Sequence, residues 1–103
     1  MKSTISKFVK GKNVEAEYLK DVPPEKSFWA SNGWVIRNME EIPKALENMA
    51  DETFTSHVNA DKNDFSTWIR EVIGDKKLAS IMQKVKNRQS AIDAINRRIK
   101  QLK

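Results

Sequence analysis

The C-terminal part of the chain carries a regular apolar repeat. From Leu78 onward, two sets of residues recur at intervals of seven, and seven of these eight positions are apolar. The sets are Leu78, Val85, Ile92 and Ile99, and Ile81, Arg88, Ile95 and Leu102. Because neither glycine nor proline interrupts residues 75–103, the repeat predicts one amphipathic helix from about Lys76 to the C-terminus. Such a helix would be about 42 Å long, since each residue adds about 1.5 Å.

This apolar seam needs a surface to cover it, because burying each such side chain is worth about 1.5–3 kcal/mol. The positions that flank the seam carry no acidic residue, so a parallel pair of identical helices would lack attractive charge pairs. An acidic partner, or the acidic middle of this chain, is a better electrostatic match. We expect the first half of the helix to join the domain core and the second half to bind a protein partner. The predicted partner-binding residues are Ile92, Ile95, Ile99 and Leu102.

A β-hairpin is predicted over about residues 27–36. Asn32-Gly33 is a strong signal for a type I′ turn, in which both central residues have positive φ. Alternation along the strand should send Phe28 and Trp29 to opposite faces. One of the two rings would then be open to a peptide or a nucleic-acid base, although the commoner arrangement is that helices cover both.

Three helical segments are expected between the hairpin and the C-terminal helix. The first begins at Asn38 with a distorted first turn, or begins near Pro43. A short turn at 52–57 follows Asp51, and a helix opened by Asp61 ends at Gly74, after which Asp75 caps the last helix. The predicted core comprises Phe28 or Trp29, Val35, Met39, Ile42, Leu46, Met49, Phe54, Phe65, Trp68, Ile69, Val72, Ile73, Leu78, Ile81 and Val85.

These elements predict a mainly α fold: a small helical domain with one short β-hairpin (about 27–36) and a long C-terminal amphipathic helix (about 76–103). The length of 103 residues suits a single domain. We divide it into a basic N-terminal segment (1–22), a core of hairpin and helices (23–82) and a basic heptad-patterned extension (83–103).

Composition and charge narrow the function classes. The chain has no cysteine, which excludes disulfides, thiolate metal sites and cysteine nucleophiles. No apolar run is long enough for a membrane span or a signal peptide, so we expect a cytoplasmic protein. The net charge of +5 is uneven: +3 over residues 1–20, −4 over 21–83 and +6 over 84–103. Two basic ends therefore flank an acidic middle.

Residues 28–82 contain a series of runs with recognisable spacing. They are Asn38 to Ile42, Ala45-Leu46, Met49, Asp51 to Phe54, His57 to Asn59, Lys62 to Arg70, Val72 to Asp75 and Leu78-Ala79. This series resembles a domain family of archaeal and some bacterial proteins that is catalogued as being of unknown function. Members often carry the domain beside unrelated modules, so the resemblance implies an accessory or interaction role and no known activity. Pro43 and the basic tail beyond residue 83 depart from the family's pattern.

Candidate sites are few. One histidine without cysteine does not make a usual zinc site, and no phosphate-binding glycine loop or nucleophile motif is present. We therefore expect no enzyme activity, catalytic residue, metal or cofactor. His57 could pair with Asp61 or Asp64 in catalysis, but a structural bond to the turn at Asn63 and Asp64 is the favoured interpretation. A weaker hypothesis is a small-molecule pocket between the hairpin and this histidine, formed by Trp29, Trp34, His57, Asn63 and Asp64.

The sequence thus favours a non-enzymatic protein-interaction or assembly module that docks through its C-terminal helix, either to a copy of itself or to an acidic partner. The alternative is a sequence-nonspecific nucleic-acid-binding protein that uses the N-terminal lysines and the basic helix. The candidate phosphate contacts are Lys84, Lys86, Arg88, Arg97, Arg98 and Lys100. A solvated face, with the long side-chain stems covering apolar surface, would explain the same residues without a partner.

Overall fold

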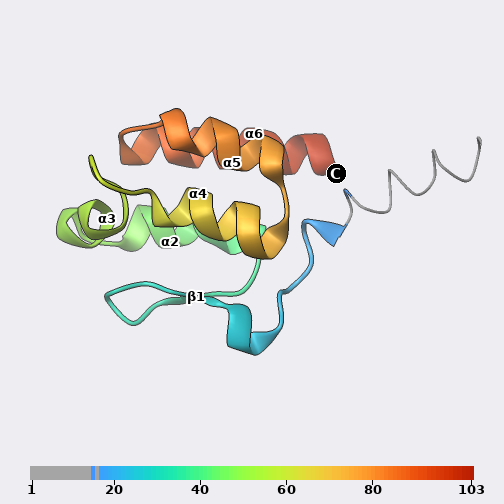
Figure 1. Ribbon diagram of the computed structural model, residues 1–103, viewed down its shortest axis with the longest axis horizontal. Coiled ribbons are helices and arrows are strands. Elements are labelled where there is room, and N and C mark those ends of the chain that lie inside the picture. Colours follow the sequence, from blue (N-terminus) through green and yellow to red (C-terminus); the bar gives the residue numbers. More distant parts are fainter. Residues whose placement is uncertain (1–14, 16) are drawn as a thin grey trace, which may run out of the picture.

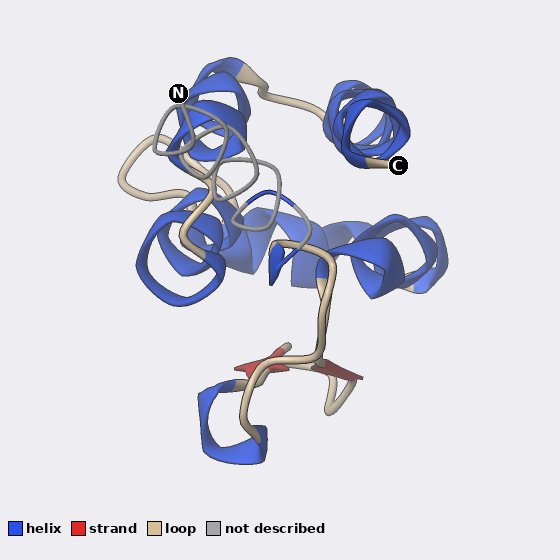
Figure 2. Ribbon diagram, turned by 90° about the vertical axis from the view of Figure 1, so that its right-hand side faces the viewer, coloured by secondary structure: helices blue, strands red, loops and turns tan. Residues whose placement is uncertain are grey.

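The computed structural model describes residue 15 and residues 17–103. In this part, three layers are stacked (Figure 1): a β-hairpin, a middle layer of helices and an outer pair of helices. Figure 2 shows the same order from the side. The elements are β1 (Phe28–Trp29), β2 (Val35–Ile36), α2 (Ile42–Asn48), α3 (Asp51–His57), α4 (Asp64–Trp68), α5 (Lys76–Lys84) and α6 (Arg88–Leu102), with 3₁₀ turns at Pro24–Lys26 and Met39–Glu41 and a π-helical turn at Ile69–Ile73. The predicted fold class is confirmed.

The C-terminal helical region is interrupted, contrary to the prediction of one helix over 76–103. Residues 85–87 separate α5 from α6, and the backbone is extended at both Val85 and Asn87. The Asn87 side-chain oxygen accepts a hydrogen bond from the Ser90 amide N–H at 2.8 Å, which caps the first turn of α6. A link this short joins antiparallel helices, so α6 runs back alongside α5. The apolar seam is thereby covered within the domain instead of remaining in water.

The hairpin pairs antiparallel, with Phe28 opposite Ile36 and Trp29 opposite Val35. Phe28 is buried and Trp29 is 68% exposed, so the prediction that they face opposite sides is confirmed. Phe28 stacks on Phe65 of α4 with ring centroids 4.6 Å apart. The hairpin is therefore held against the helices by its inner face, while its outer face is turned to solvent.

The hairpin loop differs from the predicted type I′ turn. Gly33 has a φ of +92°, and among the described residues only glycines have positive φ. The loop therefore contains one left-handed residue instead of two. Asn32 instead accepts a hydrogen bond from the Trp34 amide N–H through its side-chain oxygen at 3.0 Å, which stabilises the loop as an Asx turn.

The helix boundaries follow capping chemistry. α2 begins beside Pro43, one of the two predicted alternatives. Asn63, and not the predicted Asp61, caps α4, because its side-chain oxygen accepts the Ser66 amide N–H at 3.0 Å. Gly74 adopts the predicted left-handed conformation. Asp75 caps α5 as predicted, accepting the amide N–H of the third helical residue at 3.1 Å.

Most of the predicted core residues are buried, but Ile81 is 40% exposed. That assignment was wrong because α6 turns back beside α5 and the helix buries a different stripe, formed by Leu78, Ala79 and Met82. Val35 is only half-buried, since it lies on the outer face of the hairpin. Residues 1–14 and 16 of the predicted basic N-terminal segment lie outside the described residues, while Tyr18 and Leu19 pack against the core.

Candidate functional site

The predicted partner-binding seam lies inside the domain. Ile92 is 4% exposed and Ile95 is fully buried, and Ile99 and Leu102 are partly buried against the same core. α6 packs on α2 as well as on α5. Ile92 and Ile95 are therefore core residues, and Ile99 and Leu102 pack against that core. The prediction assumed a helix that extends past the body, whereas the break at residues 85–87 lets the seam pack within the domain.

Two of the six candidate phosphate contacts are also turned inward. Arg98 is 7% exposed, and its guanidinium forms a bidentate ion pair with Asp75, with Nε 2.8 Å from one carboxylate oxygen. Arg88 donates to the carbonyl oxygens of Leu46 and Met49 at the end of α2 and pairs with the Asp51 carboxylate. Both arginines therefore connect helices. Arg98 is paired with Asp75 and Arg88 with Asp51, so their charges are neutralised by carboxylates of this chain.

Replacing Arg88 with alanine should therefore cost stability. The variant leaves carbonyl groups at the end of α2 without their donor, a loss of about 1–3 kcal/mol. Urea unfolding followed by circular dichroism measures the change in the free energy of unfolding. Arg97→Ala is the matched control on the exposed face of α6 and should change it by less than about 0.5 kcal/mol. Equal effects of the two variants would contradict the assigned role of Arg88.

The remaining candidate cations, Lys84, Lys86, Arg97 and Lys100, are exposed. Within residues 17–103, none of them forms an ion pair. Arg97 and Lys100 border one hollow on α6 together with Asn96, whereas Lys86 borders another at the turn between α5 and α6. The exposed positive charge is therefore divided between two places.

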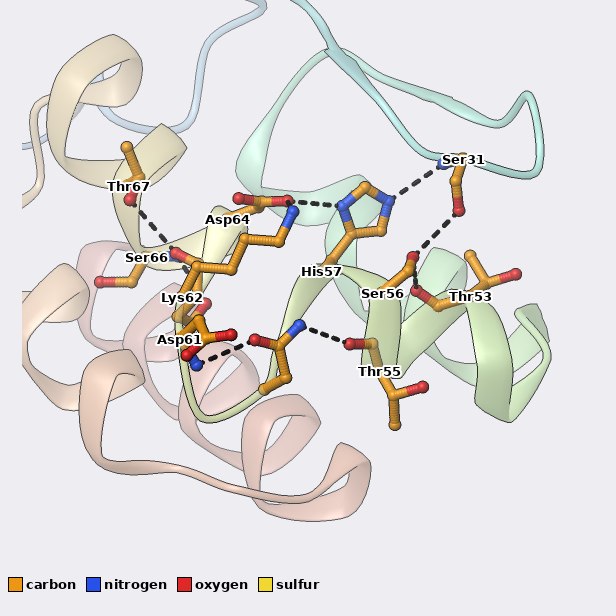
Figure 3. Close-up of polar contacts among 12 residues, drawn as sticks. Ser31, Thr53, Thr55, Ser56, His57, Asp61, Lys62, Asp64, Ser66 and Thr67 are labelled. Carbon is orange, nitrogen blue, oxygen red and sulfur yellow. Dashed lines mark hydrogen bonds and ion pairs between the residues drawn. The ribbon is translucent and has the colours of Figure 1, made fainter.

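His57 lies between the hairpin and the turn that precedes α4 (Figure 3). Its Nδ1 is 2.9 Å from a carboxylate oxygen of Asp64, and its Nε2 accepts a hydrogen bond from the Ser31 amide N–H at 3.0 Å. The ring is buried and packs edge-on against Phe28 and Phe65. The favoured prediction, a buried histidine bonded to the Asp64 turn, is confirmed. The contact with Ser31 was not predicted.

A serine, a histidine and an aspartate meet here, but their geometry does not create an activated nucleophile. A nucleophilic serine needs its hydroxyl on the imidazole nitrogen that takes its proton. In this cluster a backbone N–H occupies that nitrogen, while the Ser31 hydroxyl is 3.2 Å from the Ser56 hydroxyl. The observed bonds therefore anchor the hairpin tip to α3 and α4.

Asp64 also bonds to the Lys62 ammonium at 3.0 Å. Burial by itself would raise the pKa of Asp64, but the hydrogen bonds from His57 and Lys62 outweigh it and lower the pKa below 3.8, the ordinary value. A carboxyl group whose pKa is lower in the folded than in the unfolded state stabilises the fold above its unfolded pKa. That contribution is lost as pH falls through the folded-state pKa.

We therefore predict that Asp64→Asn makes stability less sensitive to acid. The asparagine oxygen can still accept the His57 N–H, but it has no charge to lose. Between about pH 5 and pH 3, the free energy of unfolding of the wild type should fall more steeply than that of the variant. Urea titrations at a series of pH values measure both slopes. Parallel slopes would show that Asp64 does not contribute to the acid dependence.

The five residues of the predicted small-molecule pocket do not together line either hollow found in the described part of the chain. Of its five residues, only Asn63 lines the hollow of about 510 Å³ at the turns 58–63 and 83–86. Asn63 itself caps α4 and donates to the Met82 carbonyl at 2.8 Å. The Asn59 side chain likewise donates to the Thr55 carbonyl of α3 and accepts the Asp61 amide N–H. The walls of this hollow are thus held by structural bonds, and the two tryptophans lie elsewhere.

The hairpin's outer face is the principal exposed apolar feature of the described residues. Trp29 is 68% exposed, and Val35 lies directly opposite on β2. By contrast, Trp68 is buried and donates its indole N–H to the Lys26 carbonyl at 2.8 Å. The other exposed large apolar residue, Ile81, lies on α5 in the layer farthest from the hairpin. Strand alternation was the signal for this face, although it did not specify which aromatic would be exposed.

Two further findings concern the described part of the chain. Among residue 15 and residues 17–103, no three histidine, aspartate or glutamate side chains are grouped so that they could hold a metal ion. None of the helices in that part is long and apolar enough to cross a membrane. Comparison of the chain with protein-family models, with curated proteins and with solved structures finds no match.

Proposed function

We propose that this chain is a non-enzymatic protein-interaction module whose contact surface is the outer face of the hairpin, centred on Trp29. The observation that supports it is the 68% exposure of this indole in a domain that buries its other large apolar seams. Tryptophan is enriched among residues that dominate binding energy, where it fills a pocket on the partner. The helices behind the hairpin present the ring on a fixed base through the Phe28–Phe65 stack.

The size of this face indicates the kind of partner. A stable interface buries roughly 800 Å² on each side, whereas one tryptophan contributes about 150–250 Å². Two copies meeting through Trp29 and Val35 alone would fall short of a stable dimer. The face suits a different protein with a concave apolar pocket that takes the indole, in a weak or transient complex. The Ile92–Leu102 seam has no part in this proposal.

A site-specific crosslink tests the proposal. A photo-crosslinking amino acid in place of Trp29 should give a discrete adduct with one protein, and the same residue in place of Ile81 should not. The captured protein is then purified, and its affinity for the wild-type chain is measured by calorimetry. Trp29→Ala should weaken binding about 30-fold or more, as expected for the loss of a dominant side chain. Ile81→Ala, the matched apolar control, should leave the affinity unchanged.

Two results would overturn this proposal. One is an identical pattern of adducts from positions 29 and 81, which would mean that the hairpin face has no preferred partner. The other is an affinity that Trp29→Ala leaves intact. Light scattering should show a monomer for the wild type and for Trp29→Ala alike. A dimer that this substitution dissociates would contradict the argument from interface size.

A second candidate is nonspecific nucleic-acid binding, favoured by the adjacent exposed side chains of Arg97 and Lys100 on α6. It predicts that anisotropy of a labelled duplex rises on adding the protein at about 50 mM salt and falls steeply as salt increases. The double variant Arg97→Gln/Lys100→Gln should weaken this binding, whereas Lys44→Gln on α2 should not. No binding at low salt would remove this candidate.

A further inference from the structure

The bonds of His57 require one particular form of its ring. An amide N–H can only donate, so the Ser31 N–H at 3.0 Å requires a lone pair on Nε2. In the neutral ring the hydrogen then sits on Nδ1, where it is donated to the Asp64 carboxylate at 2.9 Å. The observed contacts therefore fit a neutral imidazole, and they use both of its nitrogens.

A second proton on this ring would affect its two sides differently. The protonated ring carries a hydrogen on each nitrogen. On the Nδ1 side it still donates to the Asp64 carboxylate. On the Nε2 side its new N–H would face the Ser31 N–H, so two donors would oppose each other at hydrogen-bond distance. The ring would keep its bond to α4 and lose its bond to the hairpin.

Among residues 17–103, the ring is contacted from α4, from the hairpin and from the core. On the α4 side, the described charges facing the ring are Asp64 and Lys62, which shares the same carboxylate oxygen. On the hairpin side, the ring meets the Ser31 amide and the edge of Phe28. From the core it meets Phe65. The hairpin contact at Nε2 is itself a donor, so a protonated Nε2 has no acceptor in the Ser31 amide.

We propose that His57 is a proton-sensitive latch for the hairpin tip. The neutral ring holds Ser31 against α3, and protonation releases the tip while Asp64 at the start of α4 keeps its bond to the ring. The base of the hairpin stays attached, because the Phe28–Phe65 stack and the bond from Trp68 to Lys26 do not titrate. The hydroxyl contact between Ser31 and Ser56 is lost with the tip. This proposal does not depend on any partner for Trp29.

Nuclear magnetic resonance of the full chain from about pH 8 to about pH 5, the range in which histidines commonly titrate, tests the latch. The Ser31 amide proton should move upfield as its hydrogen bond breaks, with the same midpoint as the His57 ring signals. The Trp34 amide is the internal control, because its acceptor is the neutral Asn32 side chain. His57→Gln, which keeps a neutral acceptor near Ser31, should abolish the pH-dependent movement.

If His57→Gln does not fold, the titration of the wild-type chain is sufficient to test the latch. Movement of Ser31 together with the ring, and not of Trp34, supports the latch. A ring that titrates while Ser31 stays fixed would overturn it, because the tip would then be held by something other than Nε2. A ring that does not titrate down to about pH 5 would overturn it as well.

Discussion

Replacing Asp75 with alanine should destabilise the domain by about 3–5 kcal/mol, since it leaves the buried Arg98 guanidinium without its counter-charge. Asp75 is 1% exposed. Its two carboxylate oxygens accept bonds from Arg98 and from the amide N–H of Leu78 at the start of α5. The substitution therefore removes an ion pair and a helix cap together. For a domain whose total stability is about 5–15 kcal/mol, this is a large fraction.

Urea unfolding of the variant measures this loss, with Asp93→Ala as its control. Asp93 is an exposed acid on α6, and within the described part of the chain its carboxylate accepts a hydrogen bond from the Gln89 side chain alone. Its removal should cost less than about 0.5 kcal/mol. The double variant Asp75→Ala/Arg98→Met should be more stable than Asp75→Ala alone, because no buried charge remains without a partner. A double variant with the sum of both single losses would show that the two residues do not interact.

Ile95→Ala should cost about 2–5 kcal/mol, the usual loss for a large side chain removed from a packed core. Ile95 is fully buried within α6, which packs on α2 and α5. If Ile95 is buried within its own chain, Ile95→Ala lowers the free energy of unfolding by the same amount at every protein concentration. Chemical denaturation at two concentrations a hundredfold apart separates this from an effect on assembly.

A matched control is available on the same helix. Asn96→Ala alters the next residue, which is exposed, and alanine favours helix, so stability should stay the same or rise slightly. An Ile95→Ala variant as stable as the wild type would contradict the internal packing of α6. A loss of stability that vanishes at high protein concentration would contradict it too, because it would place the side chain in an interface between chains.

Local signals in the sequence predicted much of the fold. The spacing of Phe65, Trp68 and Ile69 predicted the buried face of α4, and Gly74 and Asp75 predicted where one helix ends and the next begins. These features are determined by residues that lie close together in the sequence, so local patterns predict them. The bond between His57 and Asp64 belongs to the same group, since the two residues are seven positions apart.

The break between α5 and α6 was missed because the apolar repeat continues across it. Of the seven residues from Lys84 to Ser90, only Val85 is apolar, and Asn87 within this stretch has a strong preference for helix caps. That weakening of the seam was the available signal. Whether a helix turns at such a point depends on whether the body offers a surface to cover, which is a property of the whole fold.

Long-range polar contacts were beyond local prediction. Asp75 and Arg98 are 23 residues apart, and Arg88 reaches carbonyl groups about 40 positions away. Once α6 lies beside α5, these arginines are turned toward the domain, although both were candidate phosphate contacts. The bond between Ser31 and His57 at the hairpin tip could not be predicted for the same reason, because the two residues are 26 positions apart.

The apolar face of α6 packs on α2 and α5 inside the domain, so we expect a protein partner to use another surface. Native-state hydrogen exchange of the Ile95 amide tests it most directly. If α6 packs within its own chain, this amide should exchange slowly, through unfolding of the whole domain, at the same rate in dilute and concentrated samples. Fast exchange in the dilute sample that slows as concentration rises would contradict it, because α6 would then be protected by another chain.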